Sequence, residues 1–518
     1  MNDGERKGKV YLVGAGPGDP KLITVRGLEA VKKADVIVYD RLASPKLLLH
    51  MKPGAEKVFV GKLPDKHMMK QEDINRLLVR LAEEGKTVAR LKGGDPSVFG
   101  RVGEEAETLA AAGIEFEIIP GITSSIAVPA YAGIPVTHRD FTSSFSIVTG
   151  HEYPNKTYNR VDWDHLAKAS GTLIFLMGVA NIGNITAELI SGGMKQSTPV
   201  ALIRWGTWME QETLTGSLSD IADKVKSSGF SSPAVIIVGD VVKLRDKISW
   251  FEKRPLFGRR ILVTRARAQA SELVDKIDEL GGDAVECPVI RTQAVGGPEA
   301  AAALDRALEQ IDQYDRVLFT SVNGVEFFFQ ACLERGIDIR RLHKAKIGAV
   351  GPKTDEALRL RGLIGEPLPE IFQGDVWAAS LAHELAPGEK VLLPRGNLAK
   401  EDVPSILRAA GADVTEAVCY ETLPSDDGVE EALELLREGR IHAVTFTSSS
   451  TVRNLLEALE KHGGGNPAVL LENVPVFCIG PVTEKTARQM GLRVTAVARE
   501  ASIASLIEEL IRHLSREE

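Results

Sequence analysis

The sequence has few cysteines and few aromatic residues for its length. Cysteine occupies only four of the 518 positions, Cys287, Cys332, Cys419 and Cys478, and aromatic residues make up 5%. The cysteines are far apart without a C-x-x-C pair, and the ten histidines form no H-E-x-x-H motif. These spacings argue against a disulfide-stapled scaffold and against a zinc cluster. We therefore expect free thiols in a reducing compartment and no bound metal.

Long apolar runs and basic tracts are also missing. No stretch reaches the ~18 apolar residues of a membrane span, and the N-terminal residues lack the apolar core of a signal peptide. The 63 basic and 71 acidic residues give a net charge of −8, with no basic tract. Apolar residues at 44% and charged residues at 26% are typical of a globular chain. We predict a cytoplasmic protein that acts on small molecules and binds neither nucleic acid nor membranes.

Apolar strand-like runs alternate with amphipathic helical stretches along the chain. KVYLVGAG (9–16) leads into LITVRGLEAVKKA (22–34), and this order predicts an α/β protein with largely parallel sheets. The charged segment 244–260 contains a proline and is interpreted as an interdomain linker. The chain then divides into halves of similar size, 1–250 and 251–518.

The second half contains an internal repeat. VLFTSVNGVEFF (317–328) is similar to AVTFTSSSTVRNLL (443–456), and AKIGAVGPKTDEALRLRG (345–362) is similar to VPVFCIGPVTEKTARQMG (474–491). The two pairs occur in the same order, which predicts two related α/β lobes, with ETLPSDDG (421–428) as the crossing between them. Each repeated turn opens a helix with Ser, Thr, Asn or Gly, and such helix starts bind anions through free backbone N–H groups.

A glycine-rich turn in the first half must be compared with a dinucleotide-binding loop. GAGPGD (14–19) follows the first strand, but the fingerprint G-x-G-x-x-G requires glycine where this sequence has Asp19. Pro17 removes a backbone N–H that such a loop would present to pyrophosphate, and a carboxylate would repel the phosphates. Asp40 stands where a dinucleotide-binding fold has its ribose-binding acid, so this residue does not separate the two alternatives. The mismatch in the glycine loop is therefore the feature that argues against a dehydrogenase.

Eight motifs in order resemble the tetrapyrrole methylase family, and within it the uroporphyrinogen-III C-methyltransferases, over nearly all of residues 8–250. These motifs are GAGPGD, VIVYD, FVGK (59–62), LKGGDPSVFGR (91–101), PGITS, GIPVTHR, LMG (176–178) and SPAVIIVGDVV (232–242). The resemblance implies two α/β lobes, about 8–119 and 120–248, with S-adenosyl-L-methionine in the cleft between them. Matched position by position, it implies cofactor contacts at Pro17, Gly93, Gly94, Asp95, Val98, Thr123, Ser124, Met177 and Gly206.

The same resemblance implies candidate groups for the methyl-transfer reaction. Methylation of a pyrrole carbon ends in loss of a proton, so a general base assists it. Asp40 matches the position of the base and Lys62 that of an acid, and the alternative is that both only bind substrate. Arg41, Arg101 and Arg139 are candidates for the carboxylates of the substrate, because guanidinium suits carboxylates. The family also implies a homodimer through this half.

The second half is similar to the uroporphyrinogen-III synthase family. The cues are ILVTRA (261–266), the paired Thr-Ser and Gly-Pro turns, LLPRGN (392–397) and VCYET (418–422). This family's fold has two flavodoxin-like lobes, implying one lobe of about 257–290 plus 425–518 and another of about 291–424. Tyr420 matches a tyrosine that assists departure of a hydroxyl; the alternative is a packing role. The expected binding positions are Ser321, Asn323, Ser448, Ser449, Thr451 and Thr483.

The two resemblances together predict a bifunctional enzyme. Its second half closes hydroxymethylbilane to uroporphyrinogen III as a lyase, and its first half methylates that product twice to precorrin-2, which leads to siroheme and cobalamin. The alternative is a methyltransferase fused to a non-catalytic substrate-binding module, and a methylase of a later corrin intermediate is a further rival. Because no further module precedes residue 8, we expect none of the dehydrogenase and ferrochelatase activity that some siroheme synthases carry.

Overall fold

The computed structural model describes residues 7–61, 69–150, 161–169, 171–265, 267–463 and 465–515. The chain forms two compact units. The first consists of Met1–Arg260, Ile277–Asp283 and Ile511–Glu518, and the second of Ile261–Lys276 and Ala284–Leu510. The first unit thus runs past the boundary predicted at residue 250. The described residues form four five-stranded sheets, two within residues 9–238 and two within residues 260–497.

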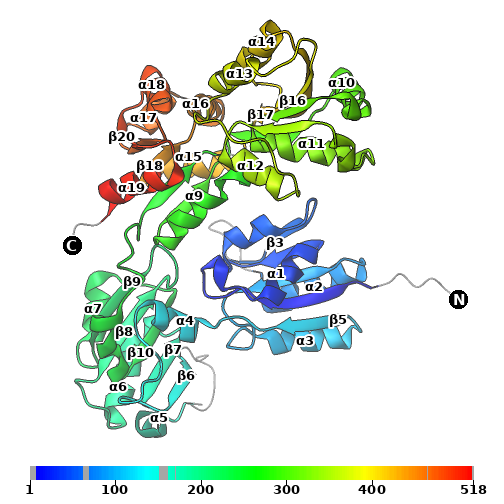
Figure 1. Ribbon diagram of the computed structural model, residues 1–518. Coiled ribbons are helices and arrows are strands. Elements are labelled where there is room, and N and C mark those ends of the chain that lie inside the picture. The colour runs from blue at the N-terminus through cyan, green and yellow to red at the C-terminus, as the bar shows by residue number, and fades with distance from the viewer. Residues whose placement is uncertain are drawn as a thin grey trace, which may run out of the picture. The chain divides into compact units, whose positions relative to one another are not determined.

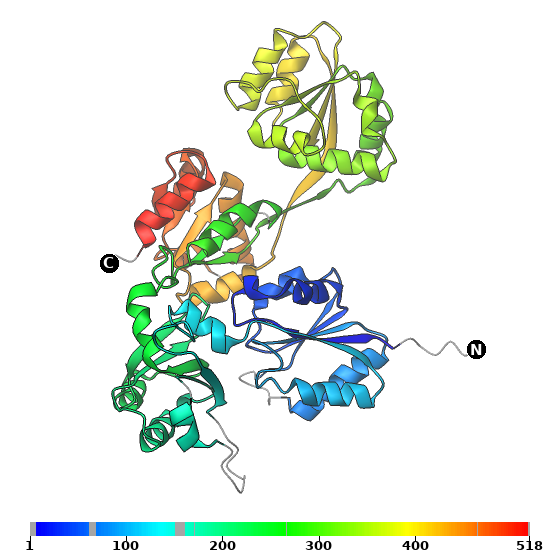
Figure 2. The same cartoon turned by 60° about the horizontal axis from the view of Figure 1, so that its bottom comes forward.

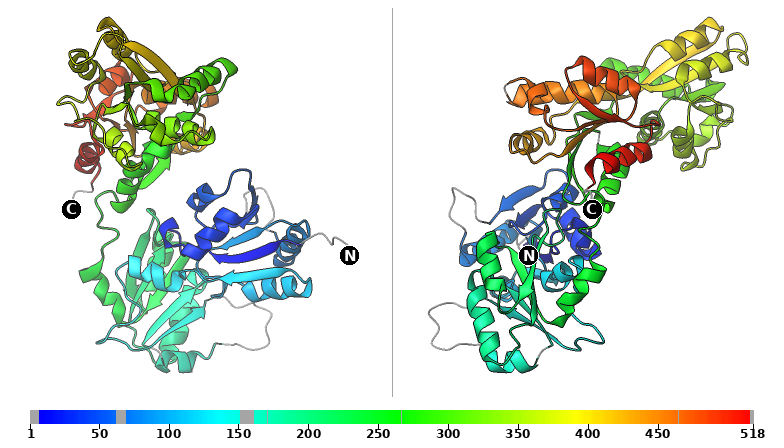
Figure 3. Two further views of the ribbon diagram at one scale, coloured as in Figure 1. Left: turned by 45° about the vertical axis from the view of Figure 1, so that its right-hand side comes forward. Right: turned by 90° about the vertical axis from the view of Figure 1, so that its left-hand side faces the viewer.

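The first sheet is parallel, with the order β3-β2-β4-β1-β5. Its strands are β1 (Lys9–Gly14), β2 (Val36–Tyr39), β3 (Glu56–Phe59), β4 (Val88–Lys92) and β5 (Glu115–Ile119), and its helices are α1 (Val25–Lys33), α2 (Gln71–Glu83) and α3 (Val102–Ala111). Successive strand residues point to opposite faces. Val36 and Val38 therefore pack with α2 and α3, whereas Ile37 packs with α1, and helices cover both faces (Figures 1 and 3).

The second sheet is mixed, with the order β6-β7-β10-β8-β9. Its strands are β6 (Phe145–Thr149), β7 (Thr172–Leu176), β8 (Pro199–Arg204), β9 (Glu212–Ser217) and β10 (Ala234–Val238), and its helices are α4 (Ser124–Tyr131), α5 (Trp163–Ala169), α6 (Ile182–Ser191) and α7 (Ile221–Ser228). Only β6 and β7 pair in parallel. The expectation of largely parallel sheets is wrong here, because a short connection rather than a crossover helix joins β8 to β9.

The segment interpreted as a linker packs against the first unit. After α8 (Arg245–Ile248), the Trp250 indole N–H donates to the Ala130 carbonyl at 3.0 Å and Phe251 is buried. The Glu252 carboxylate accepts hydrogen bonds from Gln211 at 2.8 Å and from Thr213 at 2.7 Å. Aromatic side chains in this charged stretch therefore extend the fold of the first unit.

The second unit holds the sheets β12-β11-β18-β19-β20 and β13-β17-β16-β14-β15. The strands are β11 (Arg260–Val263), β12 (Asp283–Glu286), β13 (Ile290–Ala294), β14 (Arg316–Phe319), β15 (Lys346–Ala349), β16 (Lys390–Gly396), β17 (Asp413–Pro424), β18 (Ala443–Phe446), β19 (Val476–Cys478) and β20 (Val494–Val497). The helices are α9 (Arg267–Glu279), α10 (Pro298–Glu309), α11 (Val322–Glu334), α12 (Pro352–Arg359), α13 (Gly374–Ala382), α14 (Asp402–Ala409), α15 (Val429–Arg437), α16 (Ser449–Gly463), α17 (Pro467–Leu470), α18 (Pro481–Gln489) and α19 (Ile503–Leu514). β13 and β17 are antiparallel neighbours in the sheet β13-β17-β16-β14-β15, and Figure 2 shows them extending from that sheet as a two-stranded ribbon.

The internal repeat predicted from the sequence is present in both sheets of this unit. β14 followed by α11 corresponds to β18 followed by α16, and β15 followed by α12 corresponds to β19 followed by α18. In each sheet the two strands are neighbours and parallel. Both Gly-Pro turns place the glycine before the helix and the proline at its first position, where its missing N–H costs nothing. Among the described residues, no helix is long and apolar enough to span a bilayer.

Candidate functional site

Three glycine-rich turns of the first half meet where β1, β4 and β5 end. The backbones of Gly16 and Gly94 exchange two hydrogen bonds, of 2.6 and 3.2 Å. A Cβ atom on Gly14 would lie 2.5 Å from the Gly121 Cα and 2.9 Å from the Gly94 carbonyl oxygen. Only glycine permits this approach, so the motifs at 14–19, 93–101 and 120–125 form one site.

A cleft of about 500 Å³ lies beside these turns and is lined from both lobes of the first half. Eight predicted positions line it, namely Pro17, Asp40, Gly93, Gly94, Val98, Ser124, Met177 and Gly206. Its volume lies within the roughly 300–1,000 Å³ typical of small-molecule sites. Apolar walls with a few polar groups suit a ligand that has both an aromatic ring and charged ends.

Sequence reasoning missed several residues that line the cleft, above all Gln71, Arg90, Lys92, Phe99 and Trp205. Phe99, Trp205 and the predicted Met177 have positive φ values of 55°, 47° and 59°. Such backbone is strained for bulky residues and is found where a site needs a fixed side-chain position. No sequence pattern identifies a left-handed tryptophan, but charges at alternate positions of a buried strand, as in Arg90 and Lys92, were a usable signal.

The cleft floor carries opposite charges. An Asp40 oxygen lies 3.2 Å from the Arg90 guanidinium, while the other accepts the backbone N–H of Leu42 at 3.0 Å. The Lys92 ammonium lies 2.7 Å from the carboxylate of Glu105, which is fully buried. Burial lowers the pKa of Lys92, and Glu105 offsets this only in part.

Two predicted cofactor contacts stand beside the cleft and hold its loops. The oxygens of Asp95 accept backbone N–H groups, from Ser97 at 2.7 Å and from Gly121 at 2.9 Å. Thr123 caps α4, and its hydroxyl accepts the N–H of Ser125 at 3.4 Å. These bonds fix the turn that carries Gly93 and Gly94.

The predicted basic residues lie in different surroundings. Arg41 stacks over Trp205, with its guanidinium carbon 5.7 Å from the ring centroid. Arg101 forms a two-pronged pair with Glu104, at 2.7 and 2.8 Å, and Arg139 is exposed in a turn. Lys62 lies outside the described residues.

Asp19 joins the two lobes. Its carboxylate accepts the Tyr131 hydroxyl at 2.9 Å, and its backbone N–H donates to Thr207 at 3.0 Å. Burial, reinforced by Asp19, raises the pKa of Tyr131. The residue that departs from the dinucleotide fingerprint thus has a structural partner in the other lobe.

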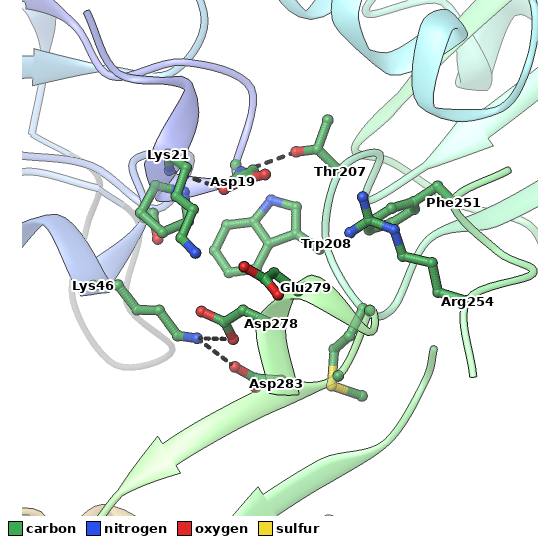
Figure 4. A pocket seen from close by; sticks show the side chains of 16 residues that line it. Asp19, Lys21, Lys46, Thr207, Trp208, Phe251, Arg254, Asp278, Glu279 and Asp283 are labelled. Atoms are coloured by element: carbon green, nitrogen blue, oxygen red, sulfur yellow. Dashed lines mark hydrogen bonds and ion pairs between the residues drawn. The ribbon is translucent and has the colours of Figure 1, made fainter. Parts of the chain in front are cut away.

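A smaller pocket of about 220 Å³ lies next to Asp19 in the first unit (Figure 4). The Lys46 ammonium points toward Asp278 and Asp283, at 3.5 and 2.9 Å. Burial alone would lower the pKa of Lys46, but the two carboxylates hold it above its usual range. Because Lys46 is already paired within this pocket and eight predicted positions line the larger cleft, the larger cleft is the stronger candidate for a ligand site.

The second unit has a cavity of about 640 Å³ at the ends of β14 and β16. Ser321 and Tyr420 line it with their hydroxyl oxygens 3.2 Å apart, and Phe327 stacks on the Tyr420 ring at 5.3 Å. Arg395, which lies in the motif at 392–397, also lines the cavity. It pairs with Glu416, which no sequence motif indicated. Two predicted residues of the second half are therefore brought together.

The other predicted binding residues of this half do not line that cavity. Asn323 lies in the first turn of α11. Ser448 accepts the N–H of Thr451 at 3.3 Å, and Ser449 accepts the hydroxyl of Thr486 at 2.8 Å. The Thr451 and Thr483 side chains are buried, so these positions offer a ligand chiefly the backbone N–H groups of α16 and α18.

Comparison with known proteins assigns both halves to families. The family of Tetrapyrrole (Corrin/Porphyrin) Methylases matches residues 9–222, and the family of Uroporphyrinogen-III synthase HemD matches residues 271–508. A Porphyrin biosynthesis protein HemD of Ruminiclostridium josui is 40% identical over 504 residues, which are 97% of this chain and 98% of that protein.

Relatives of the first half alone are closer in sequence. A uroporphyrinogen-III C-methyltransferase of Priestia megaterium is 55% identical over 235 residues, 45% of this chain and 98% of that protein. An S-adenosyl-L-methionine-dependent uroporphyrinogen III methyltransferase of Methanosarcina barkeri is 53% identical over 239 residues, 46% of this chain and 94% of that protein. This chain belongs to the tetrapyrrole methylase family through its first half and to the uroporphyrinogen-III synthase family through its second.

Proposed function

We propose that this chain carries out two consecutive steps of tetrapyrrole synthesis. The second half converts hydroxymethylbilane to uroporphyrinogen III with release of water, and the first half methylates that product twice to precorrin-2. The observation that carries the proposal is the relative from Ruminiclostridium josui, which aligns along both halves. The product of one half is the substrate of the other, which gives the fusion a chemical reason.

The cleft of the first half is the proposed methyl-transfer site, and its residues fit S-adenosyl-L-methionine. This cosubstrate supplies an electrophilic methyl group on a sulfonium sulfur. Gly93 and Gly94 let it approach the backbone, Val98 and Met177 supply apolar walls, and Asp95 holds the turn in place. A Cβ on Gly206 would lie 2.3 Å from Val128, so a side chain there would force the wall of the cleft to shift.

Asp40 is the proposed general base, because it lies in the cleft and its carboxylate is oriented by Arg90. It takes the proton that leaves the methylated macrocycle. Arg41, Arg101 and Arg139 are proposed to bind the substrate's carboxylates, and Lys62 is proposed as the acid. Arg41 rests on an aromatic ring, so it can exchange this contact for a carboxylate.

In the second half we propose that the cavity beside Tyr420 takes part in ring closure. The Tyr420 phenol, hydrogen-bonded to Ser321, assists departure of the hydroxyl by donating a hydrogen bond to it. Asn323 and the turns at Ser448, Ser449, Thr451 and Thr483 are proposed to bind propionate and acetate side chains through helix-start N–H groups. The reaction mainly requires the site to hold a flexible polyanion in a folded conformation, which depends more on such contacts than on strong acids or bases.

A homodimer through the first half and a cytoplasmic location complete the proposal. Large apolar side chains at Ile118, Ile122 and Ile126 are exposed in the first half and offer surface for a second copy. All four cysteines are free thiols, which suits a reducing compartment. Sedimentation analysis tests the dimer, and a chain that stays monomeric at micromolar concentration contradicts it.

The test of the two activities is a coupled assay on the full chain. Purified protein receives hydroxymethylbilane with and without S-adenosyl-L-methionine. We expect uroporphyrinogen III without the cosubstrate and precorrin-2 with it. If only the spontaneous isomer uroporphyrinogen I forms while supplied uroporphyrinogen III is methylated, the second half is a binding module instead.

A further inference from the structure

Four charged side chains meet at the floor of the methyl-transfer cleft. Asp40 follows β2, Arg90 and Lys92 lie on β4, and Glu105 lies on α3. The Lys92 ammonium is 2.7 Å from a Glu105 oxygen, the Arg90 Nε is 3.5 Å from the same oxygen, and another Arg90 nitrogen is 3.2 Å from Asp40. The Gln71 amide also donates to that Glu105 oxygen, at 3.0 Å.

Three of these four charged side chains are almost fully removed from water, and Asp40 is 26% exposed. The exposed fractions of the Arg90, Lys92 and Glu105 side chains are 4%, 7% and 0%. Among the described residues, the second Glu105 oxygen and the Arg90 Nε also lack a hydrogen-bond partner. Buried ion pairs are weak stabilisers, and an apolar replacement is often as stable. Stability alone therefore does not explain a buried cluster that lies against a ligand cleft.

The charge count gives the cluster a role. Of the described residues that line the cleft, only Asp40, Arg90 and Lys92 are charged, so this part of the lining carries a net charge of +1. Glu105 lies behind the lining and brings the sum to zero. A positive floor would oppose a sulfonium cation, whereas S-adenosylhomocysteine, the product of methyl transfer, has a neutral sulfur.

We propose that Glu105 is a positioning residue that holds Lys92 and Arg90 at the cleft floor and neutralises it, so that the cleft accepts a cationic sulfonium. This rests on the proposed methyltransferase function. Because Glu105 does not line the cleft, it acts through Lys92 and Arg90. Its role is to set the relative affinity for the sulfonium cosubstrate and the neutral product.

Calorimetry on the full chain tests this with S-adenosyl-L-methionine and S-adenosylhomocysteine as probes. In Glu105→Gln the floor has a charge of +1, and we expect affinity for the sulfonium to fall roughly five- to tenfold more than affinity for the neutral product. Glu105→Gln combined with Lys92→Met returns the sum to zero and should restore the ratio to within about twofold. Lys92→Met alone should shift the ratio the opposite way.

Glu107→Gln is the matched control, since Glu107 is exposed on the same helix and should leave the ratio unchanged. If Glu105→Gln weakens both ligands equally, or the double variant fails to restore the ratio, the inference is wrong. If Glu105→Gln does not fold, Lys92→Met still tests the sign of the shift. A wild-type chain that binds neither ligand would overturn the methyltransferase proposal instead.

Discussion

The two candidate sites are built in different ways. The cleft of the first half has a buried ion cluster and three lining residues with left-handed backbone, Phe99, Met177 and Trp205. In the second unit, the described residues with positive φ are all glycines, and the cavity combines the hydroxyls of Ser321 and Tyr420 with Arg395, which pairs with a carboxylate on β17. Methyl transfer creates and removes charge at fixed atoms, so it needs a rigid charged frame. Ring closure of a flexible chain needs many modest contacts.

The largest effect that would test this difference is expected for Asp40→Asn. Loss of a general base lowers a rate by about 10²–10⁴-fold, and the amide keeps the shape of the carboxylate. We expect methylation of supplied uroporphyrinogen III to fall by that factor, whereas ring closure of hydroxymethylbilane stays at the wild-type rate. Parallel assays of both reactions on one preparation give the comparison. A fall of less than about tenfold assigns Asp40 to substrate binding only.

Tyr420→Phe tests the other site and should have a smaller effect. The substitution removes the hydroxyl that forms one hydrogen bond with Ser321, and it retains the ring that stacks on Phe327. One such bond contributes about 0.5–1.5 kcal/mol, so we expect ring closure to slow by about tenfold or less, with methylation unchanged. The assay follows the ratio of uroporphyrinogen III to the spontaneous isomer I. A loss of hundredfold or more would show that this site depends on one acid as strongly as the cleft depends on Asp40.

The backbone contrast leads to a prediction about stability. Phe99 has a φ of 55° and is 45% exposed, so Phe99→Gly removes strain that Phe99→Ala retains. We expect the glycine variant to be more stable than the alanine variant by about 1 kcal/mol in urea unfolding, the reverse of the usual order. Both should raise KM for the tetrapyrrole.

The matched pair in the second unit is Leu398→Gly and Leu398→Ala. Leu398 lines the cavity and is exposed, but it is not among the residues with positive φ. Here the alanine variant should be the more stable, because glycine loses more conformational freedom on folding. If glycine is favoured at both positions or at neither, the strain does not distinguish the two sites.

Local patterns in the sequence were sufficient for the elements and for most of the cleft. The glycine motifs predicted the turns because a close backbone approach, such as that of Gly14 to Gly121, leaves no room for a Cβ. The repeat predicted paired strands because each half-repeat is one local strand–turn–helix unit. These inferences need only neighbours in sequence.

Features that depend on distant residues could not be predicted in this way. The antiparallel position of β10 between β7 and β8 is decided by pairing across the sheet. The contact of Lys92 with Glu105 joins a strand to the following helix, and although Lys92 lies in the motif at 91–101, Glu105 lies outside every motif. The burial of Phe251 and the hydrogen bond from Trp250 to the Ala130 carbonyl make the expected linker part of the first unit, and these contacts join residues far apart in the sequence.

The smallest expected effect concerns a carboxylate of the first sheet that lies outside the cleft. Asp35 accepts hydrogen bonds from Lys52 and from the backbone N–H of Thr87, and these bonds lower its pKa below the ordinary 3.8. Because the pKa of Asp35 is lower in the folded than in the unfolded protein, its carboxylate stabilises the fold at every pH above the unfolded-state pKa. This stabilisation is lost as the pH falls through the folded-state pKa. Because Asp35 is 41% exposed, we expect Asp35→Asn to cost under about 1 kcal/mol at pH 7. Unfolding curves should show the difference shrinking below pH 3.8, with both activities at pH 7 unchanged. A difference that grows toward acid would mean that the ionised carboxylate does not stabilise this sheet, and that charge contributes to the first half only at its cleft.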